Sequence, residues 1–241
     1  MALTLNPVKT HPDTVTGTLV RGGGFKGFFY SLGYLRGARN SHGYADERQV
    51  QEQLAHERNS SYYNNPQTGE KRRGDVYCYS GGCLAALVDI LDVDIDAVIL
   101  LGLSLQQDIV GGELSRFEVV RRFTEAVTEG WGGKGGERIK WLVTDLRGLG
   151  VVERVAKNRE EVIEAAVETS WIPGVTGWGL TTGRGTLDGF FSVLRHPATG
   201  FEVPGLPWDL GGLSVGLGER EARGMYDKGF REGRRDGLLK I

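Results

Sequence analysis

Two segments of the chain share one order: a short apolar strand, a glycine turn and an apolar helix. In the first, the strand is GTLVRGG at 17–23 and the helix is GFFYSLGYLRGA at 27–38. In the second, the strand VYCYS at 76–80 runs directly into the helix GGCLAALVDIL at 81–91. Strands that alternate with helices favour a mostly parallel sheet covered by helices on both faces. The expected fold class is therefore α/β.

Further apolar patterns continue this alternation along the chain. Strands are expected at 137–146 and 150–156, and helices at 95–109, 115–129 and 158–170. In the last helix, Asn158 and Glu161 have the spacing of a capping box. Residues 38–75 are polar throughout and are expected to form a variable insertion, with one exposed helix near 46–57.

Length and charge exclude few classes of protein but disfavour some partners. A chain of 241 residues can fold as one domain, and 29 basic against 31 acidic side chains give no global reason to expect a nucleic-acid partner. The basic run at 71–73 is interpreted as a solvated loop flank. The sequence shows no signal-peptide pattern and no stretch of about 20 apolar residues, so a soluble or peripherally attached chain is expected. Compartment and oligomeric state stay open.

The two cysteines, Cys78 and Cys83, lie five residues apart across the second turn. This pattern suggests neither a disulfide framework nor a zinc site. A disulfide framework usually contains more cysteines, and a zinc site needs more cysteine or histidine ligands. We interpret the two residues as small, buried and apolar. No metal is expected.

The first glycine turn permits three interpretations. Gly22, Gly24 and Gly27 satisfy the dinucleotide pattern G-x-G-x-x-G, but no apolar strand follows near Asp46 and Glu47 to supply the acidic residue for a ribose. A P-loop also lacks its lysine and hydroxyl residue at the required spacing. The turn can instead aim backbone N–H groups from a helix N-terminus at a developing oxyanion. A turn without any ligand is the third alternative.

The second turn contains a candidate nucleophile, Ser80. It sits between a strand and a helix, with Gly82 two residues after it, as in the G-x-S-x-G nucleophile elbow, although Cys78 stands two residues before it. Serine is also a common N-cap, so that use is an alternative. A serine nucleophile needs a base, and the candidates are Asp188 in an Asp-Gly pair and His196, which follows in the order of an α/β-hydrolase triad.

Taken together, five segments in order resemble the patatin-like phospholipases. They are GGGFKG at 22–27, CYSGG at 78–82, AAVETSWIPGVTG at 165–177, DGF at 188–190 and MYDKGFREG at 225–233. The resemblance implies a single three-layer α/β/α domain with a mostly parallel sheet over residues 16–233. Residues 1–15 and 234–241 would be terminal tails, with the insertion at 38–75 inside the domain.

The resemblance also implies an activity, which is hydrolysis of fatty-acyl esters in phospholipids, galactolipids or acylglycerols without a cofactor. Ser80 would be the nucleophile and Asp188 its base, and His196 would be a bystander. The implied oxyanion hole is Gly22, Gly23, Gly24, Phe25, Lys26 and Gly27, and the implied elbow around the serine is Cys78, Tyr79, Gly81 and Gly82.

Two positions depart from the family pattern. Cys78 replaces the first glycine of the elbow, and Phe190 stands where a small residue is common. Lys26 takes the place of the usual arginine, which the pattern allows. The alternative function is accordingly a catalytically silent lipid-binding or regulatory protein. In either case the expected partner is a lipid substrate, with peripheral contact to a membrane or lipid-droplet surface. Three tryptophans in glycine-rich segments are candidates for that contact or for the core: Trp171, Trp178 and Trp208.

Overall fold

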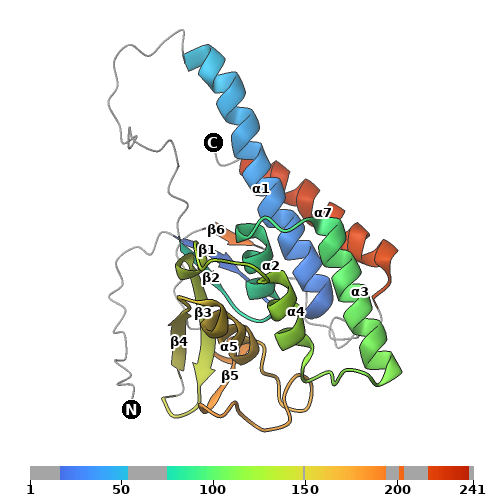
Figure 1. Cartoon of the computed structure of the whole chain (residues 1–241). Helices are drawn as coiled ribbons and strands as arrows, with labels where there is room; N and C mark the ends of the chain where they lie inside the picture. Colours follow the sequence, from blue (N-terminus) through green and yellow to red (C-terminus); the bar gives the residue numbers. More distant parts are fainter. Residues whose placement is uncertain (1–16, 54–74, 149, 194–200, 204–216, 239–241) are drawn as a thin grey trace.

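The chain folds into an α/β structure with a six-stranded mixed sheet (Figure 1). The computed structural model describes residues 17–53, 75–148, 150–193, 201–203 and 217–238. The strands are β1 (Gly17–Val20), β2 (Asp75–Cys78), β3 (Ile139–Asp145), β4 (Gly150–Val155), β5 (Thr186–Asp188) and β6 (Phe201–Val203). The helices are α1 (Gly24–Gln53), α2 (Gly81–Ile90), α3 (Ile95–Gly111), α4 (Val119–Val127), a 3₁₀ turn η1 (Gly136–Arg138), α5 (Arg159–Thr169), α6 (Phe190–Val193) and α7 (Glu219–Leu238).

The sheet is partly parallel, in the order β4-β3-β2-β1-β6, with β5 paired to β3. The pairings of β1 with β2, β1 with β6 and β2 with β3 are parallel, whereas β4 and β5 run antiparallel to β3. The two glycine turns therefore follow neighbouring parallel strands and leave the same edge of the sheet. The α/β class is confirmed, and the sheet is mixed, with three parallel and two antiparallel pairings, where a mostly parallel sheet was expected.

Alternate strand residues divide between two apolar clusters, because successive side chains of a strand point to opposite faces. Val20, Cys78 and Trp141 belong to the main core, which the helices α1 to α5 and α7 complete. Their neighbours Leu19, Tyr77 and Leu142 belong to a small second cluster with Tyr79, against which Phe190 of α6 packs. Among the described residues, the long helices thus share one core with one face of the sheet. The other face carries a much smaller cluster.

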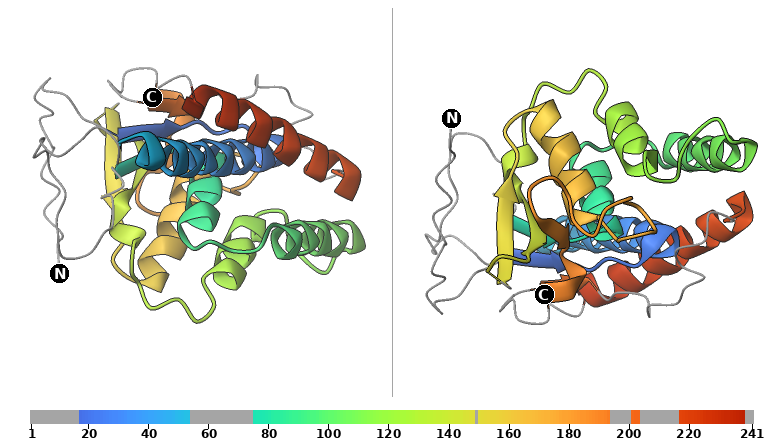
Figure 2. Two further views of the ribbon diagram at one scale, coloured as in Figure 1. Left: turned by 90° about the horizontal axis from the view of Figure 1, so that it is seen from above. Right: turned by 90° about the horizontal axis from the view of Figure 1, so that it is seen from below.

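Helix α1 differs from the expectation at both ends. It begins at Gly24 rather than at 27, and it continues to Gln53 as one helix, where a helix to 38 and a second helix near 46–57 were expected. The apolar pattern ends near residue 38, but no proline interrupts residues 38–53, so helical hydrogen bonding can continue. Figures 1 and 2 show α7 lying alongside α1.

Glycines let α1 and α7 approach each other closely. A Cβ added at Gly33 or Gly37 would clash with the backbone of α7, and one added at Gly229 or Gly233 would clash with that of α1. Across the same contact, the Tyr30 hydroxyl donates a hydrogen bond of 2.5 Å to Glu232, and the Tyr34 hydroxyl donates one of 2.7 Å to Asp236. The pair therefore combines close backbone packing with polar contacts at its rim.

The remaining expected elements are present with shifted ends. Helix α4 begins at Val119 rather than at 115, and β3 begins at Ile139 rather than at 137. Asn158 caps α5 as expected, since its side chain accepts from the Glu161 N–H at 2.9 Å, while the Glu161 carboxylate accepts from the Lys157 N–H at 2.8 Å. Within the described residues, no helix combines the length and the apolar character that crossing a membrane requires.

Candidate functional site

Ser80 occupies a strained turn between β2 and α2. Its φ of 52° and ψ of −140° lie in a region that non-glycine residues seldom adopt, and such strain concentrates at functional sites. Ser80 is the N-cap residue of α2 by position, but its side chain makes no capping hydrogen bond to the helix. Its backbone N–H is shared between the carbonyl and the hydroxyl of Thr169, each at 3.1 Å. The backbone thus holds the Ser80 side chain out of the helix.

The two glycine turns touch at this point. A Cβ added at Gly22 would lie 2.7 Å from the Ser80 Cβ, and one added at Gly81 would lie 2.8 Å from the Gly24 carbonyl oxygen. At Gly82, a Cβ would lie 2.5 Å from the Arg21 carbonyl oxygen. Glycine is therefore needed at all three positions for close approach. This packing places the N-termini of α1 and α2 beside Ser80.

The predicted oxyanion donors differ in availability. Because the first N–H groups of a helix have no acceptor in the preceding turn, the amides of Gly24 and Phe25 have no intrahelical partner. The Gly27 N–H is bonded to the Gly23 carbonyl at 2.9 Å, so Gly27 is not an available donor, in contrast to the expectation. The Gly22 backbone adjoins the Tyr79 hydroxyl and lowers its pKa, although burial outweighs this effect.

The side chain of Lys26 points to α7. Its ammonium forms a 2.8 Å ion pair with Glu221. The Lys26 side chain thus ties the start of α1 to α7.

Asp188 is the last residue of β5 and is fully buried. The pairings of β3 explain its position, because β2 pairs with the first half of β3 and β5 with the second half: Cys78 is opposite Trp141, and Asp188 is opposite Val143. The C-terminal ends of β2 and β5 therefore approach each other along β3. This register brings Asp188 to the elbow that follows Cys78.

The pKa of the Asp188 carboxyl group is close to neutral pH. Burial raises its pKa from 3.8 to about 7, while the hydrogen bond from the Phe190 N–H and the nearby Ser80 side chain oppose this rise. The Phe190 N–H donates to Asp188 Oδ1 at 2.8 Å. Oδ2 has no partner in hydrogen-bond geometry among the described residues, so the Ser80 hydroxyl interacts with the carboxyl without forming an aligned bond. The structure thus brings the predicted nucleophile and base together.

The segment that follows α5 joins Ser80 to Asp188. Thr169 accepts from the Ser80 N–H, and the Trp171 carbonyl accepts from the Asp188 N–H at 2.9 Å. The Thr169 hydroxyl in turn donates to the Leu142 carbonyl of β3 at 2.7 Å. The sequence interpretation gave Thr169 no role, although it lies inside the segment 165–177 that carries part of the family resemblance.

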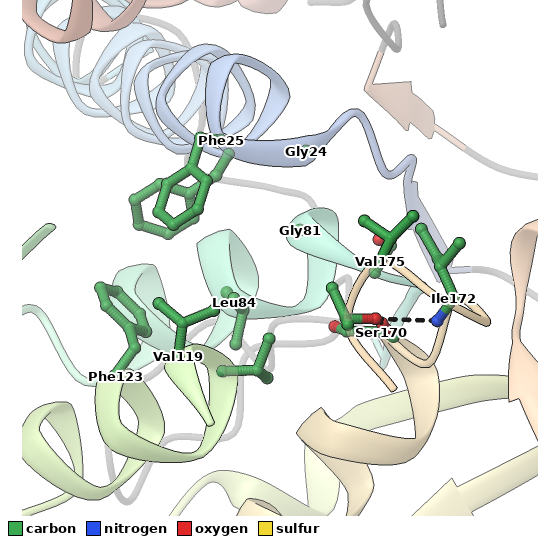
Figure 3. A pocket seen from close by; sticks show the side chains of 13 residues that line it. Gly24, Phe25, Gly81, Leu84, Val119, Phe123, Ser170, Ile172 and Val175 are labelled. Atoms are coloured by element: carbon green, nitrogen blue, oxygen red, sulfur yellow. Dashed lines mark hydrogen bonds between the residues drawn. The ribbon is translucent and has the colours of Figure 1, made fainter. Parts of the chain in front are cut away.

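An apolar pocket of about 80 Å³ opens beside Ser80 (Figure 3). In the figure, Phe25, Val119 and Phe123 lie on one side of the pocket, and Ser170, Ile172 and Val175 lie on the other. The remaining lining residues are Gly24, Phe28, Ser80, Gly81, Leu84, Val120 and Thr176. The arrangement can hold an apolar chain with its polar end at the serine.

Phe190 fits the site without displacing the base. Its backbone N–H holds the Asp188 carboxylate, and its ring packs on Tyr79, with 6.5 Å between the ring centroids. Tyr79 is itself buried, and this burial raises the pKa of its hydroxyl to about 12, so it stays protonated at neutral pH. The large residue after the Asp-Gly pair therefore covers the second face of the sheet.

Cys78 and Cys83 form a disulfide bond, which corrects the expectation of two free cysteines. The first helical turn of α2 brings Cys83 back over the end of β2, so the two Cα atoms are 4.9 Å apart. Sequence spacing alone did not show this approach, because it depends on the sharp turn at Ser80. The loop that the bond closes contains Tyr79, Ser80, Gly81 and Gly82, and both cysteines are fully buried.

The double substitution of Cys78 and Cys83 by alanine is expected to lower the free energy of unfolding by about 2 kcal/mol, the value typical of a disulfide that closes a short loop. For a chain of this size, the melting temperature would fall by roughly 4–8 °C. Differential scanning calorimetry measures the change, and thiol alkylation of denatured wild-type protein with and without reductant checks the bond. Thiols that alkylate without reductant would contradict the prediction.

The remaining predicted positions are His196 and the three tryptophans. His196 and Trp208 lie outside the described residues. Trp178 is 83% exposed and contacts Phe117, with 4.3 Å between the ring centroids, whereas the half-buried Trp171 donates to the Gly179 carbonyl at 3.3 Å.

The described part of the chain contains no cluster of three or more histidine, cysteine, aspartate or glutamate side chains placed to hold a metal ion.

Comparisons of the chain with protein-family models, with curated proteins and with solved structures found no match.

Proposed function

We propose that this protein is a serine acyl hydrolase that cleaves fatty-acyl esters of lipids, with Ser80 as nucleophile and Asp188 as base. One observation carries the proposal: a serine at positive φ adjoins a fully buried carboxyl group whose pKa is raised to about 7. Structural N-caps and turns require neither feature. The proposal includes the finer patatin-like arrangement, in which a third layer covers the second face of the sheet.

Acylation begins with the ionised form of Asp188. As the Ser80 Oγ bonds to the ester carbonyl carbon, its proton passes to the Asp188 carboxylate. The oxyanion that forms is stabilised by backbone N–H groups at the N-termini of α1 and α2, those of Gly24, Phe25 and Gly81. When the bond between the carbonyl carbon and the alkoxy oxygen breaks, that oxygen takes the proton from Asp188. The acyl group remains on Ser80.

Deacylation repeats the sequence with water in place of the alcohol. Asp188 accepts a proton from the water as its oxygen attacks the acyl carbon, and the same N–H groups hold the second oxyanion. The Ser80 Oγ leaves with the proton, and a fatty acid is released. Because the enzyme stabilises charge with fixed dipoles, the steps need little reorganisation of the site.

The apolar pocket supports an acyl substrate. Its walls include Phe25, Phe28, Leu84 and Phe123, which offer no charged group to a polar ligand. An acyl chain in the pocket would bring its ester carbon to Ser80, at the polar end. Phospholipids, galactolipids and acylglycerols share this ester, so the proposal covers all three head groups.

Labelling with a long-chain alkyl fluorophosphonate tests the proposal, because this probe modifies only an activated serine. We expect one adduct, located on Ser80 by peptide mapping, and none on heat-denatured protein. Folded protein that takes up no adduct but binds lipid vesicles would contradict the hydrolase and favour the silent lipid-binding alternative. An adduct on another residue would show that Ser80 is not the nucleophile.

A further inference from the structure

The Ser170 hydroxyl is buried without a partner. Ser170 follows the last residue of α5 and is 5% exposed, and its Oγ makes no hydrogen bond to any described residue. Burying a hydroxyl without a partner costs free energy, so nearly all buried polar side chains in proteins are hydrogen-bonded. A buried hydroxyl without a partner on the wall of a pocket therefore indicates a group that can hydrogen-bond to a ligand.

Ser170 lies in the pocket beside the nucleophile. It lines the same cavity as Ser80, and Figure 3 places it next to Ile172 and Val175. Its two chain neighbours hold the catalytic pair, since Thr169 accepts from the Ser80 N–H and Trp171 accepts from the Asp188 N–H. The backbone at Ser170 is therefore fixed relative to both reacting side chains.

The third hydroxyl of this pocket is already occupied. Thr176 Oγ1 donates to the Ser170 carbonyl and accepts from the Ile172 N–H at 2.8 Å. Apart from Ser80, Ser170 thus supplies the side-chain hydroxyl among the lining residues that has no partner in the described structure. Its polar contact is the one that the surrounding apolar walls do not provide.

We propose that the Ser170 hydroxyl contacts the substrate by donating a hydrogen bond to the alkoxy oxygen of the ester. This inference rests on the proposed function. During acylation, the bond between the acyl carbon and the alkoxy oxygen breaks, and the oxygen receives its proton from Asp188 while Ser170 keeps its own. In deacylation the attacking water occupies the same position and accepts the same hydrogen bond.

The contact favours the transition state over the bound ester. Negative charge builds on the alkoxy oxygen as its bond to carbon lengthens, and a hydrogen bond to a charged acceptor is stronger than one to a neutral acceptor. Removing the hydroxyl is therefore expected to lower kcat rather than to raise KM. For one hydrogen bond of this kind, the loss in kcat/KM is expected to be about 10- to 100-fold.

Ser31 offers a matched control. It is 1% exposed, and its Oγ also lacks a partner among the described residues, but it is not among the lining residues of this pocket. Ser170→Ala and Ser31→Ala remove the same atom from equally buried positions. Neither deletion breaks a hydrogen bond of the described structure, so both variants are expected to keep the wild-type melting temperature or exceed it slightly.

The experiment compares the two variants and the wild type by fatty-acid release from a monoacylglycerol, whose alkoxy leaving group needs this help, together with thermal unfolding and with Ser170→Thr, which restores a hydroxyl. Loss of kcat in Ser170→Ala alone, with partial recovery in Ser170→Thr, is the expected result. Equal activity of Ser170→Ala and Ser31→Ala would overturn the inference and leave the proposed function standing. A parallel fall in melting temperature would assign Ser170 a structural role instead. Wild-type protein without turnover would overturn both proposals.

Discussion

Replacing Ser80 by alanine is expected to abolish ester hydrolysis, with a loss in kcat of roughly 10⁴-fold or more. The reason is chemical, because alanine has no oxygen to bond to the acyl carbon and the remaining groups can only orient water. The substitution removes one atom at a position where the Ser80 side chain makes no capping bond, so the fold is expected to persist. Turnover of a p-nitrophenyl ester and fluorophosphonate labelling measure the two losses.

Ser31→Ala serves as the control here as well, since it removes a buried hydroxyl outside the pocket. It should hydrolyse the ester as the wild type does. Full activity of Ser80→Ala with an unchanged melting temperature would show that Ser80 is not the nucleophile. Attention would then turn to serines outside the described residues.

Replacing Asp188 by asparagine is expected to lower kcat by about 10²- to 10⁴-fold, because an amide cannot accept the serine proton. In the wild type, only the ionised carboxylate is a base, so kcat/KM should rise with pH and level off above a midpoint near the pKa of about 7. The asparagine variant should show no such midpoint. Initial rates between pH 5 and pH 9 provide the measurement.

The same substitution is expected to have the opposite effect on stability. The pKa of Asp188 is about 7 in the folded chain and 3.8 in the reference state, so between these values the folded chain binds more protons than the unfolded chain. Its free energy of unfolding therefore falls as pH rises from about 4 to about 7 and is then constant. Linkage gives up to about 4 kcal/mol for this single group.

Because asparagine carries no charge, the free energy of unfolding of this variant does not fall in the same way as pH rises. Asp188→Asn is expected to unfold at a higher temperature than the wild type at pH 8, and the difference should shrink toward pH 5. Thermal unfolding at the two pH values measures it, and Ser31→Ala should show no pH-dependent difference from the wild type. A variant that is less stable at pH 8 than at pH 5, relative to the wild type, would contradict the burial of an ionisable Asp188.

Local patterns predicted much of the secondary structure. The helix that begins at Gly81 and the cap at Asn158 were predicted as the structure has them, and the strand expected at 76–80 is present as Asp75–Cys78. These features depend on residues that are neighbours in the chain. The end of the first helix was predicted wrongly. Helix α1 continues to Gln53, beyond its apolar pattern, and it lies against α7, which is far away in sequence.

The site was predictable in its residue types and less so in its contacts. The glycine turn and the serine between strand and helix pointed to Ser80, and family resemblance pointed to Asp188. Nothing in the spacing showed that Thr169 would bind the Ser80 N–H, or that Cys78 and Cys83 would form a disulfide. Both depend on the backbone angle at Ser80, which a pattern of residue types does not contain.

The sequence by itself determined the α/β alternation and the two glycine turns, since periodicity and backbone freedom are properties of adjacent residues. Only the tertiary structure decided that Asp188 faces the elbow. That position follows from the shared use of β3, whose first half pairs with β2 and whose second half pairs with β5. Strand register is set by contacts between distant segments, and burial by the whole core, so the raised pKa of Asp188 also appears only in the folded chain.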